Sequence, residues 1–168
     1  MMSAQDPRNK FKTSDYDQQE QELPGLQSKM TPQPDCGETS YKGHERLKGY
    51  KMLVTGGDSA IGRAAAIAYA KEGADVAINY LPSEEEDAQE VKQVIEDAGQ
   101  KGILIPGDLR DEQFNYDMVE TAYNELGGLD NVTLVAGHQQ YHDDIHGFNT
   151  EAFAVVREAS KRVFGMRH

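Results

Sequence analysis

From residue 51 onward, short runs of aliphatic residues alternate with longer segments in which apolar residues recur at the spacing of a helix face. The aliphatic runs predict four β-strands, at residues 51–55, 75–79, 102–106 and 131–136. The segments between them predict three amphipathic helices, over about residues 61–71, 83–98 and 114–126. Because strands and helices that alternate in this way form βαβ crossovers, the expected fold is α/β with a parallel sheet.

Both ends of the predicted helices carry sequence signals. Glycines follow them at Gly73, Gly99 and Gly127, where a helix end favours the left-handed conformation. Ser83 and Glu86 have the spacing of a capping box at the start of the second helix, and the carboxylates at 84–87 complement its dipole. The side chains expected in the core are Val91, Val94, Ile95 and Ala98 from the second helix, and Phe114, Met118, Val119, Ala122, Tyr123 and Leu126 from the third.

Residues 1–47 do not follow this pattern. They hold four of the six prolines and many Gln, Asp, Glu and Ser residues, with almost no apolar periodicity. A segment of this composition buries too little apolar surface to offset the entropy of ordering, so we expect an extended, largely disordered arm. We expect the arm to precede a half-domain at 48–150, and residues 151–168 to form a divergent tail with a short helix. The apolar positions of the tail that could share one helix face are Phe153, Val156, Val163 and Phe164.

The length of 168 residues allows one domain and an appendage, and the composition argues against several function classes. With 29 acidic and 17 basic residues, the net charge of −12 repels polyanions, so nucleic-acid binding is not expected. No apolar run approaches the roughly 20 residues of a membrane helix, and residues 1–20 lack the apolar centre of a signal peptide. We therefore expect a cytoplasmic protein with no membrane partner. The single Cys36 predicts neither an internal disulfide nor a metal site.

The segment Thr55-Gly-Gly-Asp-Ser-Ala-Ile-Gly62 connects the first predicted strand to the first helix. Gly56 permits a sharp exit from the strand, the small Ala60 lets backbone approach a pyrophosphate, and Gly62 lets the helix pack closely on the sheet. The first amides of the helix then face the phosphates. A merely glycine-rich turn is the alternative. The position between strand and helix favours a dinucleotide-binding turn in a Rossmann-type, doubly wound parallel sheet, of which about four strands, the N-terminal half, are present.

The spacing of Gly56, Ala60 and Gly62 resembles that of the short-chain dehydrogenase/reductase family. Asp108-Leu109 is similar to the pair that meets adenine in that family, and Ala136-Gly137 is similar to the end of its Asn-Asn-Ala-Gly signature. The resemblance covers about residues 20–150. Within the arm, the residues that resemble the N-terminal extension of a bacterial subgroup, the glucose-dehydrogenase-like or aldehyde reductase-like oxidoreductases, are Pro24-Gly25, Met30, Pro32, Pro34-Asp35, Gly37-Glu38, Ser40-Tyr41 and Gly43.

The resemblance implies a set of nucleotide contacts and an arm that lies over its own subunit or a neighbour. Where the family often has an Asp that holds the ribose of NAD, this chain has Asn79, which does not repel a 2′-phosphate. With Arg63 expected nearby, the preferred cofactor is NADP, and NAD is the alternative. The residues expected to contact the dinucleotide are Gly56, Asp58, Ser59, Ile61, Gly62, Asn79, Tyr80, Asp108, Leu109, Ala136 and Gly137.

The chain departs from the family pattern at several positions. Ala60 replaces the commoner glycine, and Leu134 and Val135 replace the paired asparagines. Hydride transfer in the family uses a Ser and a Tyr with a Lys four residues later, and none of the eight tyrosines here has that Lys. After about residue 150 the resemblance ends. We therefore expect a cofactor-binding portion without catalytic residues, and a frameshift or deletion in a longer gene is the hypothesis that accounts for it.

Other interpretations of the chain stay open. His138, His142 and His146 could share a helix face and bind a metal, but glycines on both sides favour a loop, so no metal is predicted. The family is typically homotetrameric, yet a tetramer is not assumed here because the helices of its dimer interface lie wholly or partly beyond the resemblance. A nucleotide-binding or interaction module that pairs with an intact relative, and a non-functional gene product, are the alternative functions. The sequence does not indicate a substrate.

Overall fold

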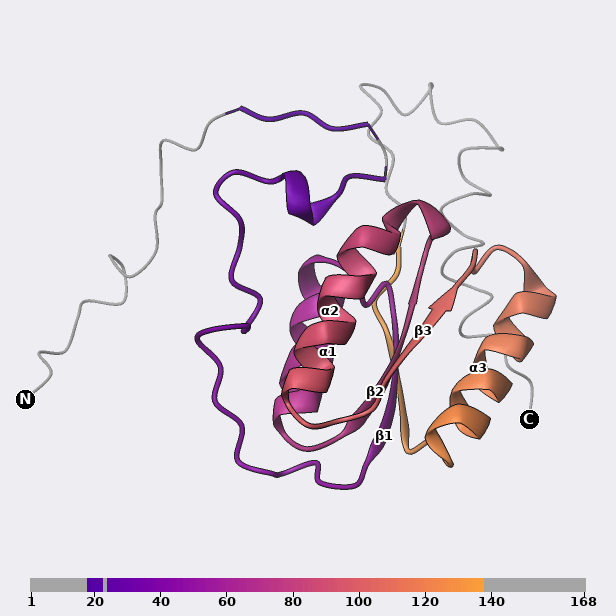
Figure 1. Ribbon diagram of the computed structural model, residues 1–168. Coiled ribbons are helices and arrows are strands. Elements are labelled where there is room, and N and C mark those ends of the chain that lie inside the picture. The colour runs from indigo at the N-terminus through magenta and orange to yellow at the C-terminus, as the bar shows by residue number, and fades with distance from the viewer. Residues whose placement is uncertain (1–17, 23, 138–168) are drawn as a thin grey trace, which may run out of the picture.

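The arrangement of strands and helices confirms the expected Rossmann-type α/β fold. The structure, a computed structural model, describes residues 18–22 and 24–137 (Figure 1). Within them, a parallel sheet of order β3-β2-β1-β4 contains β1 (Lys51–Thr55), β2 (Asp75–Tyr80), β3 (Gly102–Pro106) and β4 (Asn131–Leu134). The α-helices are α1 (Ala60–Lys71), α2 (Glu85–Asp97) and α3 (Glu112–Leu126), and two short 3-10 turns are η2 (Gln27–Lys29) and η3 (Pro82–Glu84).

The sheet is covered on both faces, with α1 and α2 on one side and α3 on the other (Figure 1). Successive residues of β1 point to opposite faces, so Met52 and Val54 pack with α1 and α2, whereas Leu53 packs with α3. Leu53 and Val54 are both 0% exposed. Full burial of an aliphatic side chain of this size stabilises the folded state by roughly 1.5–3 kcal/mol relative to leaving the side chain exposed. Burial on both faces explains why the strands read as continuous aliphatic runs.

The last strand is shorter than its apolar run predicts. β4 ends at Leu134, and the backbone N–H groups of the next two residues, Val135 and Ala136, contact Thr55 at the end of β1. Both donate hydrogen bonds to the Thr55 hydroxyl, at 3.1 and 3.3 Å, and Ala136 also donates to the Thr55 carbonyl at 3.1 Å. Thr55 therefore fixes the chain that follows β4 beside the end of β1.

The start of the second helix differs from the expected capping box. Ser83 lies inside η3, and α2 begins at Glu85 with Glu84 at its N-cap position. The carboxylate of Glu84 accepts a hydrogen bond from the backbone N–H of Leu81 at 3.2 Å. Because Pro82 starts a tight 3-10 turn, it brings Glu84 rather than Glu86 within reach of the preceding backbone.

The buried face of α3 is rotated relative to the expected one. Tyr123, expected in the core, is 57% exposed, whereas Asn115 is 4% exposed. The Asn115 side chain donates a hydrogen bond to the Leu109 carbonyl at 2.9 Å, which offsets the cost of burying its amide. In α2 the expected core residues Val94 and Ala98 are only partly buried. A pattern of apolar residues alone could not predict that a polar residue such as Asn115 is buried.

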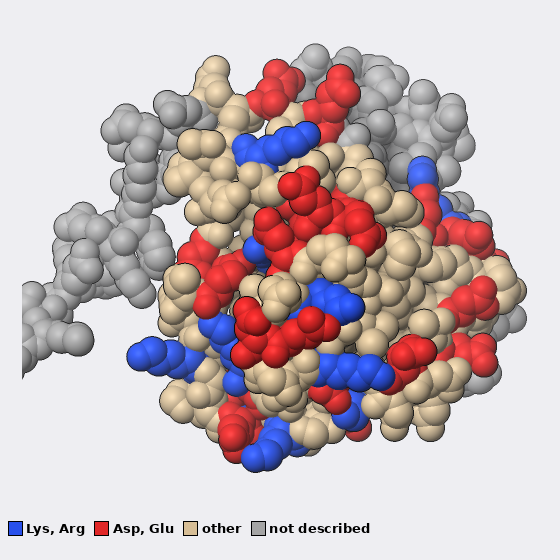
Figure 2. Space-filling model, viewed as in Figure 1, with Lys and Arg blue, Asp and Glu red and all other residues tan. Residues whose placement is uncertain are grey.

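The described part of the arm, residues 18–22 and 24–47, runs beside α1 and α2 (Figure 1). The Lys71 ammonium, at the end of α1, donates hydrogen bonds to the carbonyls of Gly37, Glu38 and Tyr41 at 2.7, 2.6 and 3.1 Å. The composition predicts that this segment does not pack against the domain. Composition could not reveal the packing, because the contacts that hold the segment are polar and involve few residues. Acidic and basic side chains accordingly lie next to one another over the face viewed in Figure 2. The boundaries at residues 47 and 150 stay predictions.

Glu72, next to Lys71, is the second anchor of the arm, and its side chain is 5% exposed. Its carboxylate accepts hydrogen bonds from the backbone N–H groups of His44 and Arg46, from the Arg46 guanidinium and from the Tyr41 hydroxyl. The Arg46 guanidinium and the Tyr41 hydroxyl hold the pKa of Glu72 below its usual range. A carboxylate with a lowered pKa stabilises the fold only while it is ionised.

We predict that Glu72→Gln weakens the attachment of the arm and removes part of the acid sensitivity of the fold. In the wild type, stabilisation by Glu72 is complete above the ordinary glutamate pKa of about 4.3 and is lost as pH falls through the lower folded value. Melting curves between about pH 7 and pH 3 measure this effect. The Tm of Glu72→Gln should be lower at pH 7 and fall less on acidification. An exposed control, Glu120→Gln on α3, should follow the wild type; a Glu72→Gln curve parallel to the wild type contradicts the assignment.

Candidate functional site

A cavity of about 620 Å³ lies at the carboxyl ends of the strands. The turn after β1, the end of β2, the loop after β3 and residues 135–137 after β4 all contribute to its wall. The chain passes from β1 outward to β2 and β3 and then returns to the other side of β1 to form β4. This reversal is the position at which doubly wound sheets bind ligands.

Ten of the eleven residues expected to contact a dinucleotide line this cavity, and Gly62 does not. Gly62 instead lies under the turn, where an added Cβ would be 1.8 Å from the carbonyl oxygen of Gly56. The structure therefore brings the sequence-predicted residues together, while their roles in binding stay predictions. The ten lining residues are Gly56, Asp58, Ser59, Ile61, Asn79, Tyr80, Asp108, Leu109, Ala136 and Gly137.

The cavity wall also contains residues outside the expected set of contacts. Pro24 and Gly25 come from the arm, and a periodicity argument could not place them because the arm has no periodicity. The other additional residues are Ala60, Leu81, Glu84, Gly107, Arg110 and Val135, which adjoin the expected positions in the sequence or, for Glu84, follow Tyr80 by four residues. The one feature of the sequence that points to these six residues is that they are close to the motifs. Including the neighbours of each motif would have identified them.

The glycine positions of the turn between β1 and α1 have no room for side chains. A Cβ at Gly57 would lie 2.6 Å from the Cβ of Ile78, and Gly56 has a positive φ of 62° beside Ala136. Ala60 also has a positive φ, 45°, which residues with a Cβ rarely adopt. Ile61 is 74% exposed at the first turn of α1. A helix that begins in this way presents its first N–H groups at the cavity, as a pyrophosphate requires.

At the end of β2, two of the lining residues have structural partners. Asn79 is 2% exposed, and its side-chain amide donates hydrogen bonds to the carbonyls of Ile105 and Gly107, both at 3.1 Å. It thereby holds the loop after β3 against β2. Tyr80 is also 2% exposed, and its hydroxyl donates to the Glu85 carboxylate at 2.6 Å. Burial and the Glu85 carboxylate raise the pKa of Tyr80.

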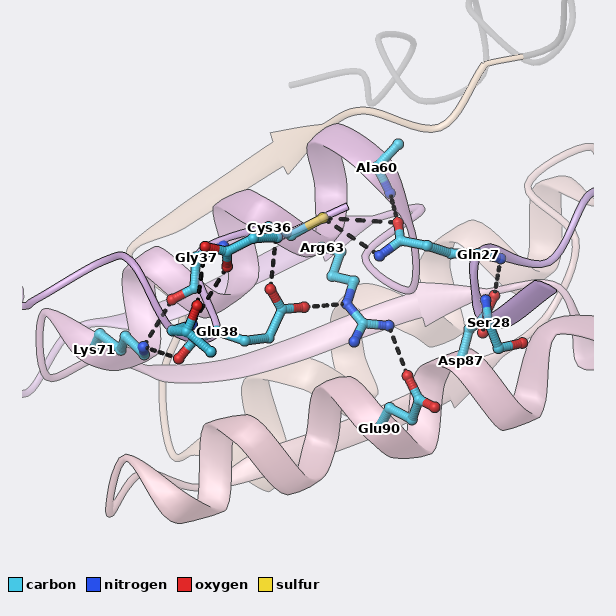
Figure 3. Close-up of polar contacts among 12 residues, drawn as sticks. Gln27, Ser28, Cys36, Gly37, Glu38, Ala60, Arg63, Lys71, Asp87 and Glu90 are labelled. Atoms are coloured by element: carbon cyan, nitrogen blue, oxygen red, sulfur yellow. Dashed lines mark hydrogen bonds and ion pairs between the residues drawn. The ribbon is translucent and has the colours of Figure 1, made fainter. Parts of the chain in front are cut away.

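The structure does not support the expectation that Arg63 lies near a 2′-phosphate. Arg63 is 7% exposed and does not line the cavity. Its guanidinium forms ion pairs with Glu38 of the arm at 2.7 Å and with Glu90 of α2 at 3.1 Å (Figure 3). Since Arg63 is one turn into α1 on the side that packs against the arm and α2, these two carboxylates hold it away from the cavity.

The charged groups of the cavity wall are mostly acidic. Asp58 is 2% exposed, its Oδ2 atom has no hydrogen-bond partner among the described residues, and burial raises its pKa. Burial and the nearby carboxylates of Asp58 and Asp87 raise the pKa of Glu84. Arg110 forms an ion pair with Asp108 and lowers the pKa of that carboxyl.

These features fit a nucleotide. A glycine cradle that a Cβ would fill lets backbone approach a phosphate closely, and the orphaned carboxylate oxygen of Asp58 suits a hydroxyl donor such as a ribose. Among the described residues, no three His, Cys, Asp or Glu side chains are grouped as metal ligands. No helix in that part of the chain is long and apolar enough to cross a membrane. The histidines at 138, 142 and 146 and the predicted tail helix lie outside the described residues.

The fold and the site together define a Rossmann-type α/β protein with its cavity at the topological reversal of the sheet. Residues 51–160 match the family described as short chain dehydrogenase. The chain is 58% identical over 153 residues to the protein named Uncharacterized oxidoreductase YghA of Escherichia coli (strain K12), an alignment that covers 91% of this chain and 52% of that protein. The chain therefore belongs to the short chain dehydrogenase family. It spans about half the length of the curated relatives it matches.

Solved structures of the family resemble the described fold. A short chain dehydrogenase from Burkholderia cenocepacia J2315 in complex with NADP is 36% identical, with a TM-score of 0.61, over 70% of this chain and 46% of that one. A short chain dehydrogenase from Mycobacterium paratuberculosis bound to NAD is 25% identical, with a TM-score of 0.65, over 71% of this chain and 48% of that one. Nicotinamide dinucleotides are thus the ligands of both of these structures.

We predict that Gly62→Ala destabilises the fold strongly. The new Cβ would be 1.8 Å from the oxygen and 2.7 Å from the carbon of the Gly56 carbonyl, so the backbone must shift. Such overpacking costs about 1–3 kcal/mol, and urea unfolding measures the free-energy change. In the control Gly25→Ala, the new Cβ meets Gln21 at an ordinary contact distance of 3.6 Å, so the expected change is within about 0.5 kcal/mol. Equal stability of the two variants contradicts the close approach of α1 to the turn.

Proposed function

We propose that this chain binds a nicotinamide dinucleotide in the cavity, as the cofactor-binding portion of a short-chain dehydrogenase/reductase-type oxidoreductase. The observation that carries the proposal is the convergence of the glycine turn, the end of β2, the loop after β3 and residues 135–137 on one cavity. Four strand ends that are far apart in the sequence supply one wall, which a merely glycine-rich turn does not explain. The ligands named for the two solved structures support the same class of cofactor.

The residues have separate roles in this proposal. The first N–H groups of α1 bind the pyrophosphate, since they combine the helix dipole with donors that no residue of the helix satisfies. Asp58 accepts a hydrogen bond from a ribose hydroxyl through its unpartnered oxygen. Asp108 and Leu109 adjoin the adenine, as the family resemblance implies. When bound, the nicotinamide is the carrier of the hydride.

The choice between NAD and NADP has opposing contributions. The expectation of NADP rested on the neutral Asn79 and on Arg63, and only Asn79 still supports it because Arg63 is paired elsewhere. Asp58 and Glu84 line the cavity, and carboxylates there oppose a 2′-phosphate. NADP therefore stays a prediction that depends on Asn79 alone, and titration with both nucleotides measures the balance.

We further propose that this chain binds the cofactor without turnover. None of its eight tyrosines has a Lys four residues later, so the general acid/base pair of the family is not encoded in it. Pairing with an intact relative as an interaction module, and a non-functional gene product, stay the alternative predictions, as does the cytoplasmic location. Copurification with a longer homologue tests the first alternative.

We predict that millimolar NAD or NADP raises the Tm of the chain. At a ligand concentration 100 times Kd, binding to the native state adds about 2.7 kcal/mol, which raises the Tm of a domain of this size by about 5 °C or more. Ile61→Asp places a carboxylate at an exposed position of the first turn of α1, where it repels the pyrophosphate. Its apo Tm should stay at or above that of the wild type, because an acidic residue complements the helix N-terminus. Its response to the nucleotide should be lost.

The control for this experiment is Tyr116→Asp, which adds the same charge at a half-exposed position of α3 outside the cavity. Tyr116→Asp should respond to the nucleotide like the wild type. A wild-type Tm that neither nucleotide moves, or an Ile61→Asp variant that responds in full, contradicts the proposed function.

A further inference from the structure

The side chain of Gln27 reaches from the arm to the glycine turn of the cavity (Figure 3). Its Oε1 atom accepts a hydrogen bond from the backbone N–H of Ala60 at 2.7 Å. Its Nε2 atom donates to the sulfur of Cys36 at 3.4 Å, so both ends of the amide have a partner. Gln27 is only 6% exposed. A buried amide with both ends engaged holds one orientation, in which the oxygen faces the turn.

The backbone of the same arm segment is attached to α2. The carboxylate of Asp87, which is 0% exposed, accepts hydrogen bonds from the N–H groups of Gln27 at 2.6 Å and Ser28 at 3.0 Å (Figure 3). Hydrogen bonds to an ionised carboxylate are about twice as strong as neutral ones. The point from which Gln27 reaches the turn is therefore set by α2, independently of the Gln27 side chain.

The turn has two features that make an external acceptor necessary. Ala60 holds a φ of 45°, a conformation that favours glycine, and nothing in its own side chain stabilises it. Ser59, at the N-cap position of α1, makes no side-chain hydrogen bond to the helix. The Gln27 oxygen thus takes the place of the missing cap at Ala60, while the following N–H groups of the first helical turn are left for phosphate oxygens.

We infer that Gln27 is a positioning residue for the dinucleotide: through Ala60 it holds the turn in the shape that binds pyrophosphate, and it thereby links docking of the arm to cofactor binding. This inference rests on the proposed function. Two further arm residues, Pro24 and Gly25, line the cavity and make the link direct. Because such linkage is reciprocal, a bound dinucleotide stabilises the docked arm by the same factor by which the docked arm raises nucleotide affinity.

The test compares dissociation constants of NAD and NADP, measured by calorimetry on the full chain. Gln27→Met keeps the length of the side chain and removes the acceptor, which leaves the Ala60 N–H without a partner, so Kd should rise about tenfold. The matched control is Gln33→Met, because Gln33 donates to the Ser28 carbonyl within the arm and does not touch the turn. Its Kd should stay within about twofold of the wild type.

A second substitution separates positioning of the turn from general loosening of the arm. Glycine adopts a positive φ without the penalty of a Cβ, so Ala60→Gly makes the turn less dependent on the Gln27 oxygen. Ala60→Gly should therefore restore the affinity of Gln27→Met to within about threefold of the wild type. A Gln27→Met variant that binds like the wild type, or a deficit that Ala60→Gly does not reduce, overturns the inference.

If Gln27→Met does not fold, the wild-type chain provides the deciding measurement. Saturating NAD should slow cleavage by trypsin after Lys29, which lies in η2, several-fold more than cleavage after the exposed Lys101, and equal slowing overturns the inference. The two proposals fail in different ways. A wild type that binds neither nucleotide removes the proposed function and the inference with it, whereas normal wild-type binding with an unchanged Gln27→Met overturns the inference alone.

Discussion

The tight passage of the chain from β1 into α1 is the constraint on which the rest of the structure depends. Gly57 and Gly62 stand where a Cβ would meet Ile78 or the Gly56 carbonyl, so strand and helix approach more closely than side chains allow. That approach places the first N–H groups of α1 at the end of β1, beside the reversal of strand order toward β4. The cavity follows from these two facts together, because parallel strands end at one edge and a helix N-terminus opens onto it.

The arm adds a polar layer to this core. It is held by a few charged side chains, above all Glu72 just after α1 and Asp87 in α2, and not by apolar burial. Because these carboxylates are nearly inaccessible to water, their hydrogen bonds to arm backbone are stronger than surface contacts. The arm in turn determines what the cavity contains. It holds Arg63 away through Glu38, and it presents Gln27 to the turn. The charge of the site therefore depends on both the arm and the β1–α1 segment, although the glycine motif lies in the β1–α1 segment alone.

Much of the fold could be predicted because its signals are local. A strand that is buried on both faces must be a run of aliphatic residues, and a close turn must use glycine. The sequence therefore predicts β1, β2 and the Gly56–Gly62 segment. The misses have distant causes. Arg63 was expected near a 2′-phosphate, but its partners Glu38 and Glu90 come from other segments. Asn79 was interpreted as a neutral side chain that does not repel a 2′-phosphate, whereas in the structure its side-chain amide holds the loop after β3. Periodicity could not show either pairing, because it compares only near neighbours in the chain.

Amide hydrogen exchange with and without NAD tests the central claim most directly, since it reports where a ligand protects the backbone. If the strand ends form one dinucleotide site, NAD slows exchange in the Gly56–Gly62 turn and in the segments after β2 and β3, and leaves the exposed face of α3 unchanged. Protection confined to other parts of the described chain, or none at saturating NAD, would contradict the account and leave the family membership as descent without cofactor binding.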